Sequence, residues 1–320
     1  MLARQVWAVI LAGGQGTRML DWIEATSGTR RPKQFCTFTG SRSMLEHTLS
    51  RARAVAAPQN TVTVITRGQR QHLAAAVRGE LPGLVVEQPA DRGTAAAVLF
   101  ALAHIMEQEP EAVVLILPAD HYVRPEASFA LHARFACHVA GELPGRFVVL
   151  GAAPDGPETD YGWIAAEPAT TPGRKAAMQL RHVTHFREKP DAKEAARLYE
   201  AGALWNTLVV AARARTLWSF AARLLPEPTA RFSLMRGVIR TARVGHSTDT
   251  VAGTIVSWLY QGMPFADFSR SILQEAAHAT FVAPLRGVEW SDWGRPERVL
   301  KTLQRASSAP TASISSALIV

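Results

Sequence analysis

Residues 6–18 read VWAVILAGGQGTR, and this stretch decides the fold of the chain. The apolar run 6–12 is typical of a buried strand, and the glycines after it predict a tight turn at the end of that strand. Arg4 before the run gives it a superficial likeness to a signal peptide, but the run has only seven residues and leads directly into the turn. We therefore expect residues 6–12 to form the first strand of the domain.

The glycines of this turn predict a binding site for phosphate. They let the backbone approach a phosphate closely and point N–H groups at it, and Arg18 adds a guanidinium suited to phosphate oxygens. The pattern lacks the Lys-Ser/Thr pair of a P-loop and does not match the G-x-G-x-x-G dinucleotide fingerprint. A plain tight turn is the alternative interpretation of the glycines alone.

Short apolar runs alternate with helical patterns over the first half of the chain. Strands are expected at 6–12, 61–65, 84–87, 112–117 and 147–150, and helices at 44–55, 69–77, 93–106 and 127–140. This alternation predicts an α/β fold with a doubly wound, mostly parallel, Rossmann-like sheet. Ligands bind at the carboxyl ends of the strands in such sheets, so motifs directly after strands are candidates for a site.

The alternation of predicted strands and helices becomes less regular after residue 150, where the predicted loops are longer. Strands are expected at 161–166, 180–186, 206–211 and 280–282, and helices at 192–200, 214–224 and 248–260. We predict one domain over residues 1–305, built from the halves 1–150 and 151–305. A Ser/Ala/Thr-rich flexible tail is expected over 306–320.

Composition narrows the classes of partner. Lys and Arg number 35 against 27 Asp and Glu, and this net charge of +8 suits nucleic acid, an anionic membrane or phosphorylated small molecules. The cations form no long run and no nucleic-acid-binding signature is present, so we expect no nucleic-acid partner. No apolar stretch reaches the roughly 18 to 20 residues of a membrane span. Cys36 and Cys137 form no metal-ligand pattern, and we expect a cytoplasmic protein.

Two further motifs of the first half carry polar side chains. In residues 31–35, RPKQF, Lys33 follows a proline and is placed to reach a triphosphate held by the glycine turn. Asp120 follows the predicted strand 112–117, where a carboxylate is a candidate Mg²⁺ ligand, with a turn residue as the alternative. His121 beside it is expected to be structural.

Two motifs of the second half complete the candidates. Glu188 and Lys189 follow a strand and could hold sugar hydroxyls and a phosphate, although a Glu-Lys pair alone is commonplace. Asp292 lies between Trp290 and Trp293 and offers a second carboxylate.

Taken in order, these motifs resemble the sugar-phosphate nucleotidyltransferases, and the mannose-1-phosphate guanylyltransferase branch in particular. The stretches that carry the resemblance are LAGGQGTR, RRPKQF, EQPADRGTAAAV, LPADHYV, TDYGWI, FREKPD, LWNTLVV and EWSDWG. They occur in the family's order and span roughly residues 6 to 295, which is nearly the whole chain.

The resemblance implies that GTP and mannose 1-phosphate are converted to GDP-mannose and pyrophosphate, with Mg²⁺ as cofactor and in-line attack on the α-phosphorus. It assigns residues 1–150 to nucleotide binding and 151–305 to the sugar phosphate. Arg18 and Lys33 match the catalytic cations, and Asp120 and Asp292 the metal ligands. The implied nucleotide contacts are Leu11, Ala12, Gly13, Gly14, Gly16, Thr17, Gln88, Arg92, Gly93 and Thr94. The implied sugar-phosphate contacts are Asp120, Tyr161, Gly162, Glu188, Lys189 and Asn206.

Several departures from the family pattern fall on the sugar and base contacts. The family's Asn-Ser-Gly is Asn206-Thr207-Leu208 here, and the lost glycine is expected to narrow the sugar pocket or shift its backbone. The family's Leu-x-Pro-Leu segment is residues 19–22, Met-Leu-Asp-Trp, and its Glu-Pro is Gln88-Pro89. Arg270 stands where the family often has Asp.

These departures leave three alternatives open. The enzyme could use another sugar 1-phosphate or another nucleoside triphosphate, or the chain could be a catalytically silent regulatory homologue. Pro-Lys-Gln also occurs in the cytidylyltransferases of isoprenoid synthesis, but those chains are shorter and lack the later motifs. Dimers are common in the family, so a homodimer is one option for assembly. From the length of 320 residues we expect no fused isomerase domain of the size that some relatives carry.

Overall fold

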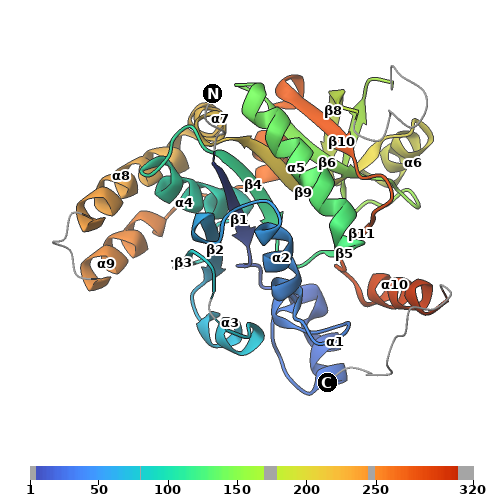
Figure 1. Ribbon diagram of the computed structural model, residues 1–320, viewed down its shortest axis with the longest axis horizontal. Helices are drawn as coiled ribbons and strands as arrows, with labels where there is room; N and C mark the ends of the chain where they lie inside the picture. The colour runs from blue at the N-terminus through green and yellow to red at the C-terminus, as the bar shows by residue number, and fades with distance from the viewer. Residues whose placement is uncertain (1–4, 80, 169–178, 244–248, 309–320) are drawn as a thin grey trace.

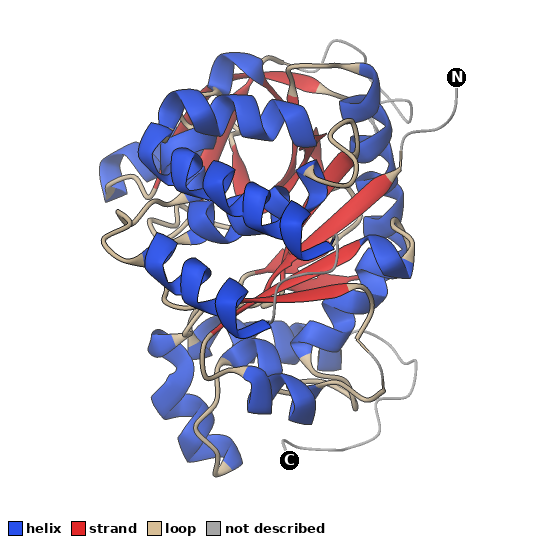
Figure 2. Ribbon diagram, turned by 90° about the vertical axis from the view of Figure 1, so that its left-hand side faces the viewer, coloured by secondary structure: helices blue, strands red, loops and turns tan. Residues whose placement is uncertain are grey.

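A nine-stranded sheet with helices on both faces forms the centre of the computed structural model, which describes residues 5–79, 81–168, 179–243 and 249–308 (Figures 1 and 2). The strands are β1 Val6–Leu11, β2 Thr61–Thr66, β3 Leu84–Gln88, β4 Val113–Pro118, β5 Tyr122–Arg124, β6 Phe147–Ala152, β7 Gly162–Ala166, β8 Arg181–Glu188, β9 Leu204–Arg213, β10 Thr280–Pro284 and β11 Glu289–Ser291. The α-helices are α1 Thr17–Ser27, α2 Met44–Arg53, α3 Arg70–Ala76, α4 Thr94–Met106, α5 Glu126–Glu142, α6 Ala192–Glu200, α7 Ala214–Leu224, α8 Pro226–Arg243, α9 Asp249–Tyr260 and α10 Pro296–Ser308.

The order of the strands in the main sheet is β3-β2-β1-β4-β9-β6-β10-β8-β7. The pairs β3–β2, β2–β1, β1–β4 and β6–β10 are parallel, whereas β9 and β8 run against their neighbours. The predicted α/β class with its mostly parallel, Rossmann-like sheet is therefore confirmed, and the antiparallel β9 separates its two parallel parts. Because β1, β3 and β4 are parallel, their carboxyl ends meet at one edge.

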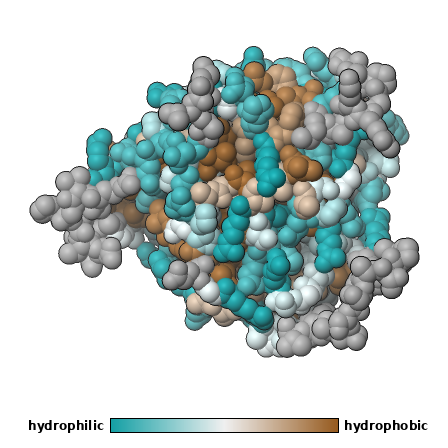
Figure 3. Space-filling view, viewed as in Figure 1, coloured by the Kyte–Doolittle hydropathy of each residue, from teal (hydrophilic) through white to brown (hydrophobic). Residues whose placement is uncertain are grey.

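Alternating side chains of β1 reach opposite faces of the sheet, as the period of a strand requires. Trp7 and Val9 pack in a core with α4, α7, α8 and α9, and Ala8 and Ile10 pack in a second core with α2, α3, α5 and α6. The near-continuous apolar run of this strand thus reflects burial on both faces. Side chains on the exposed surface are mostly hydrophilic in the view of Figure 3, with hydrophobic patches between them.

A third, smaller cluster lies beside the main cores. It joins Met19 and Ile23 of α1 to Tyr122 of β5, Trp293, and Val299 of α10. The two-stranded sheet β11-β5 runs next to it, with Trp290 opposite Val123. This cluster brings the last part of the described chain back to the first helix.

The predicted strands and helices all occur in the described residues, except that residue 248 lies outside them. Helices α1, α8 and α10 have no counterpart in the sequence prediction, nor do β5 and β11. Both α8 and α10 begin at a proline, which favours a first helical turn because its missing N–H is not needed there. Residues 306–308, expected to belong to the tail, continue α10, and the rest of that tail lies outside the described residues. The described part of the chain contains no helix long and apolar enough to cross a membrane.

Candidate active site

The glycine turn after β1 is held in place through its carbonyl groups. Gln34 Nε2 donates hydrogen bonds of 2.7 Å to the carbonyl oxygens of both Ala12 and Gly14. Thr66 Oγ1 donates to the carbonyl oxygen of Gly13 at 2.9 Å. Side chains therefore occupy the acceptors of this turn, and its N–H groups remain suited to an anionic ligand.

Gly13 has no room for a side chain. A β-carbon at this residue would lie 2.8 Å from Thr66 Oγ1 and 3.1 Å from Gln88 Nε2. Gly16 then caps α1 without a side-chain hydrogen bond, and the first turn of α1 has no acidic residue. The amino end of α1 is thus a favourable place for negative charge.

A cavity of about 290 Å³ opens at the carboxyl edge of β1, β3 and β4. Residues predicted to bind nucleotide or metal that line it are Leu11, Gly13, Gly14, Gln88, Gly93, Thr94 and Asp120. The parallel register of the three strands brings them together although they are up to 109 positions apart in the chain. Tyr260 donates a hydrogen bond of 3.1 Å to Gln88 Oε1 and orients that amide.

Four other predicted nucleotide contacts lie near this cavity without lining it. Ala12 is buried, and its N–H donates to Val64. Gly16 and Thr17 begin α1, and the backbone of Arg92 accepts a hydrogen bond from Ala266.

Lys33 connects the two predicted metal ligands. Its side chain is only 6% exposed, and its Nζ lies 3.1 Å from Asp120 Oδ2. The same ammonium donates a short hydrogen bond to the backbone carbonyl of Asp292. A β-carbon on Gly16 would be 3.9 Å from Lys33 Cγ, so this lysine also packs against the glycine turn. The structure therefore brings Lys33, Asp120 and Asp292 together beside the turn.

Asp292 is held by three donors on one oxygen. Its Oδ1 accepts hydrogen bonds from the Tyr161 hydroxyl at 2.8 Å, the Gly294 N–H at 2.8 Å and Arg298 Nη1 at 2.9 Å. Burial favours the protonated form of Asp292, but the charges of Lys33 and Arg298 outweigh it and lower its pKa to about 2. This carboxylate is ionised at neutral pH.

His121 is a neutral, buried neighbour of Asp120. Burial lowers its pKa to about 4, although the charge of Asp120 acts in the opposite direction. Its Nδ1 accepts a hydrogen bond from Trp290 Nε1 at 3.2 Å, and its Nε2 lies 3.7 Å from Asp120 Oδ1. The geometry agrees with the structural role expected for this histidine.

Arg18 lies on the Asp292 side of the glycine turn. Its side chain is 56% exposed, and Nη1 is 3.6 Å from Asp160 Oδ2. Its Nη2 would be 3.2 Å from a β-carbon on Gly294, the same point that lies 2.5 Å from Asp292 Oδ2. The guanidinium is therefore next to the candidate metal ligand.

Gly162, Glu188 and Asn206 meet as the resemblance implied for a sugar site. A β-carbon on Gly162 would lie 2.5 Å from Glu188 Oε2 and 3.1 Å from Asn206 Cβ. Glu188 Oε2 is buried and has no hydrogen-bond partner among the described residues. Burial, and then the charge of Asp267, raises the pKa of Glu188 to about 7. A buried acceptor of this kind suits a ligand hydroxyl.

The other predicted sugar-phosphate residues take different places. Tyr161 directs its hydroxyl at Asp292, behind the candidate metal ligand. Lys189 is exposed, has φ +48°, and donates its N–H to the Tyr161 carbonyl at 3.2 Å. Its backbone thus joins the end of β8 to the start of β7.

Leu208, where the family has glycine, adopts φ +55°. Its N–H donates to Asn206 Oδ1 at 3.0 Å, and its side chain lines the cavity at the glycine turn. Left-handed backbone is unfavourable for a leucine by about 1 kcal/mol or more. Glu188 and Asn206 do not line this cavity, so the expected narrowing of the sugar pocket stays a prediction.

Sequence reasoning missed three residues that support the site. Gln34 anchors the glycine turn, Asp267 lines the cavity and faces Glu188, and Arg298 holds Asp292. Gln34 could have been found from the sequence, because it directly follows the candidate residue Lys33. Asp267 and Arg298 lie on late segments, and only the fold brings them to the site.

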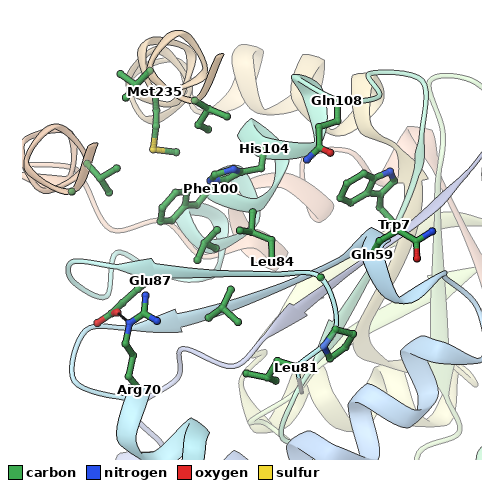
Figure 4. Close-up of a pocket in the computed structure, with 18 of the residues that line it drawn as sticks. Trp7, Gln59, Arg70, Leu81, Leu84, Glu87, Phe100, His104, Gln108 and Met235 are labelled. Carbon is green, nitrogen blue, oxygen red and sulfur yellow. Dashed lines mark hydrogen bonds and ion pairs between the residues drawn. The ribbon is translucent and has the colours of Figure 1, made fainter. Parts of the chain in front are cut away.

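A larger cavity, of about 1110 Å³, lies elsewhere, between the edge strand β3 and helices α4, α8 and α9. Figure 4 shows Phe100 and His104 of α4 facing Leu84 and Met235, with the Arg70–Glu87 ion pair at the margin. Its walls are mostly apolar and include neither the glycine turn nor Lys33. The candidate residues described above therefore lie apart from this larger cavity.

Comparison with known proteins identifies the family of the chain. The model of the family described as nucleotidyl transferase matches residues 7–307. A mannose-1-phosphate guanylyltransferase of Sinorhizobium fredii is 30% identical over 300 residues, which are 91% of this chain and 54% of the relative. The xanthan biosynthesis protein XanB of Xanthomonas campestris is 33% identical over 206 residues, 63% of this chain and 41% of the relative. The chain thus spans about half or less of the length of these curated relatives.

A solved structure has the same fold. The crystal structure described as a mannose-1-phosphate geranyltransferase from Thermus thermophilus superimposes with a TM-score of 0.75 at 27% identity. The match covers 92% of this chain and 79% of that one.

Proposed function

The chain belongs to the nucleotidyl transferase family, and we propose that it transfers a guanylyl group from GTP to mannose 1-phosphate, giving GDP-mannose and pyrophosphate. The observation that carries the proposal is Lys33, which joins Asp120 and Asp292 beside the glycine turn. The relative from Sinorhizobium fredii, named as a mannose-1-phosphate guanylyltransferase, supports the choice of substrates.

The reaction is an in-line displacement at the α-phosphorus of GTP. A phosphate oxygen of mannose 1-phosphate forms the new bond, the bond from the α-phosphorus to the bridging oxygen breaks, and pyrophosphate leaves with the electron pair. Positioning and charge neutralisation supply the catalysis, as in other phosphoryl transfers. The glycine turn and the amino end of α1 hold the triphosphate, and Arg18 and Lys33 neutralise charge on it.

Asp120 and Asp292 fit a Mg²⁺ ion. Among the described residues no group of three or more His, Cys, Asp or Glu side chains is arranged for a metal. Mg²⁺ with a nucleotide commonly takes one or two carboxylates and completes its shell with phosphate oxygens and water. Asp292 stays ionised, and Asp120 is partly exposed at the cavity. When bound, the ion would neutralise part of the negative charge of the phosphates.

The sugar end of the substrate is assigned to the group around Glu188. Its unpartnered Oε2 accepts a sugar hydroxyl, and Asn206 lies next to it. Lys189, exposed beside Glu188, contacts the sugar phosphate.

A second candidate, a different sugar 1-phosphate, is favoured by a specific observation. Leu208, which donates its N–H to Asn206 Oδ1, stands where the family has glycine, and the charge of Arg270 acts on Glu188. Both features alter the sugar side while the phosphate side keeps its residues.

Release of pyrophosphate from a panel of nucleoside triphosphates and sugar 1-phosphates tests the proposal. We expect the highest kcat/KM with GTP and mannose 1-phosphate, and no turnover after EDTA removes Mg²⁺. A higher value with another pair would replace the substrates and keep the reaction class. Calorimetry with GTP and Mg²⁺ completes the test, since binding without turnover of any pair would indicate a silent homologue.

A further inference from the structure

Helix α10 docks directly behind Asp292. Val299 on this helix is fully buried in the cluster that also holds Trp293, Met19 and Ile23. Trp293 Nε1 donates a hydrogen bond of 3.1 Å to Thr302 Oγ1, one turn further along α10. The helix is therefore fixed against the residue that follows the candidate metal ligand.

Arg298 extends from this helix and forms ion pairs with three carboxylates. Its Nη1 lies 2.9 Å from Asp292 Oδ1, and its Nη2 lies 2.8 Å from Glu158 Oε2 and 3.2 Å from Asp160 Oδ2. Its guanidinium carbon is 4.3 Å from the centre of the Tyr161 ring. The side chain is 11% exposed, so these ion pairs are largely shielded from solvent.

These contacts give the two oxygens of Asp292 different environments. Oδ1 receives Arg298, Tyr161 and the Gly294 N–H, and a carboxylate with three donors on one oxygen cannot rotate without breaking them. Oδ2 accepts none of these bonds, and it lies 2.5 Å from the point that a β-carbon on Gly294 would occupy, a point 3.2 Å from Arg18 Nη2. The planar fork of Arg298 also ties Asp292 to the loop before β7, which a point charge could not do at several partners at once.

We propose that Arg298 is a positioning residue, which fixes the Asp292 carboxylate so that its Oδ2 is presented to the metal ion that accompanies the nucleotide. This role rests on the proposed function, in which Asp292 binds Mg²⁺. Outer partners of metal ligands orient those ligands, and their loss typically weakens metal affinity by about 10- to 100-fold. Arg298 does not itself touch the substrate.

Binding of Mn²⁺ in the presence of GTP, measured by electron paramagnetic resonance, tests the proposal without relying on turnover. We expect Arg298→Met to raise the Kd for Mn²⁺ by about 10- to 100-fold. The Mg²⁺ concentration for half-maximal turnover should rise by a similar factor, with the KM for mannose 1-phosphate at saturating Mg²⁺ unchanged. Lys301→Ala is the matched control, because Lys301 lies on the same helix and pairs with Asp155, 2.8 Å away. It should keep the wild-type Kd.

The outcomes separate the two proposals. A folded Arg298→Met protein with wild-type Mn²⁺ affinity overturns the positioning role and leaves the proposed function standing. If Arg298→Met does not fold, Arg298→Gln, which retains a donor but neither charge nor fork, takes its place under the same criterion. A wild-type protein that binds no Mn²⁺ with GTP overturns the proposed function, and the role of Arg298 with it.

Discussion

The two halves of the domain differ in which residue types adopt a left-handed backbone conformation. Up to residue 150, every described residue with a left-handed φ is a glycine, including Gly16 and Gly93 around the phosphate side. After residue 150, three described non-glycine residues adopt it, Lys189, Leu208 and Trp293, and each adjoins a candidate contact for sugar or metal. The first half leaves room for the ligand next to its backbone, whereas the second half keeps side chains in unfavourable backbone to line or support the site. Strained residues of this kind concentrate at functional sites.

The largest effect is expected where the two halves meet. Asp120→Asn and Asp292→Asn should each lower Mg²⁺-dependent turnover about 1,000-fold, because each removes charge from the centre that joins the halves. Steady-state release of pyrophosphate measures this turnover. Asp155→Asn, whose carboxylate pairs with Lys301 at the outer surface, is the control. Wild-type rates in either site variant would remove that residue from the metal site.

Arg18 should matter in the transition state. Arg18→Ala is expected to lower kcat about 100-fold, because a positioned cation that neutralises developing charge contributes mainly there. Arg18→Lys should recover part of the rate, since it retains the charge but not the fork. A variant that changes only KM would contradict the role.

Gly13 and Gly14 test how strictly the phosphate side needs open space. Gly13→Ala forces a β-carbon to within 2.8 Å of Thr66 Oγ1, and we expect a loss of about 1 to 3 kcal/mol in the free energy of unfolding. Gly14→Ala places its β-carbon where no atom lies within 4 Å and should leave that free energy nearly unchanged. Urea denaturation compares the two, and equal losses would show that crowding is not the reason for glycine here.

Leu208 tests whether the second half needs a side chain in left-handed backbone at the site. Leu208→Gly removes a side chain from the cavity wall and suits the left-handed backbone, so bulkier sugar phosphates should gain about 10-fold in kcat/KM relative to mannose 1-phosphate. Leu208→Ala, which widens the cavity but keeps a β-carbon, should show part of the gain. No change in relative kcat/KM in either variant would place Leu208 outside the sugar pocket.

The smallest effect concerns pH and Glu188. Its pKa in the folded protein is about 7, above the ordinary value of 4.5, so the unfolded chain releases this proton first as pH rises. The free energy of unfolding should therefore fall between about pH 4.5 and 7 and level off above. Glu188→Gln should lack this component when both proteins are denatured across that range. Parallel pH profiles for the two proteins would contradict the raised pKa.

Much of the fold was predictable because each signal is local. The run VWAVIL contains its own strand pattern, and burial on both faces explains why it lacks alternation. The reversed direction of β9 was not predictable, because a mostly apolar run indicates a strand without its direction, and the neighbouring strands β4 and β6 that run against it are also mostly apolar. The helices that begin at Pro226 and Pro296 were missed because proline is read more readily as a break than as a first turn.

The site divides in the same way. Gly13, Lys33 and Asp120 stand next to strands or in short motifs, and the sequence identifies them as candidates. Arg298 has no such marker, since an arginine on a helix is usually a solvated side chain. Its role becomes visible only when Tyr161 and Asp292 are found around it.

The sequence by itself determined the alternation of strands and helices, the glycine turn and the candidates for the phosphate side, because these depend on neighbours within a few positions. Only the tertiary structure decided that Lys33 bridges Asp120 to Asp292, that Leu208 lines the cavity in left-handed backbone, and that Arg298 of α10 holds Asp292. The physical reason is that these contacts join residues up to 259 positions apart, and strand order and helix docking set their distances.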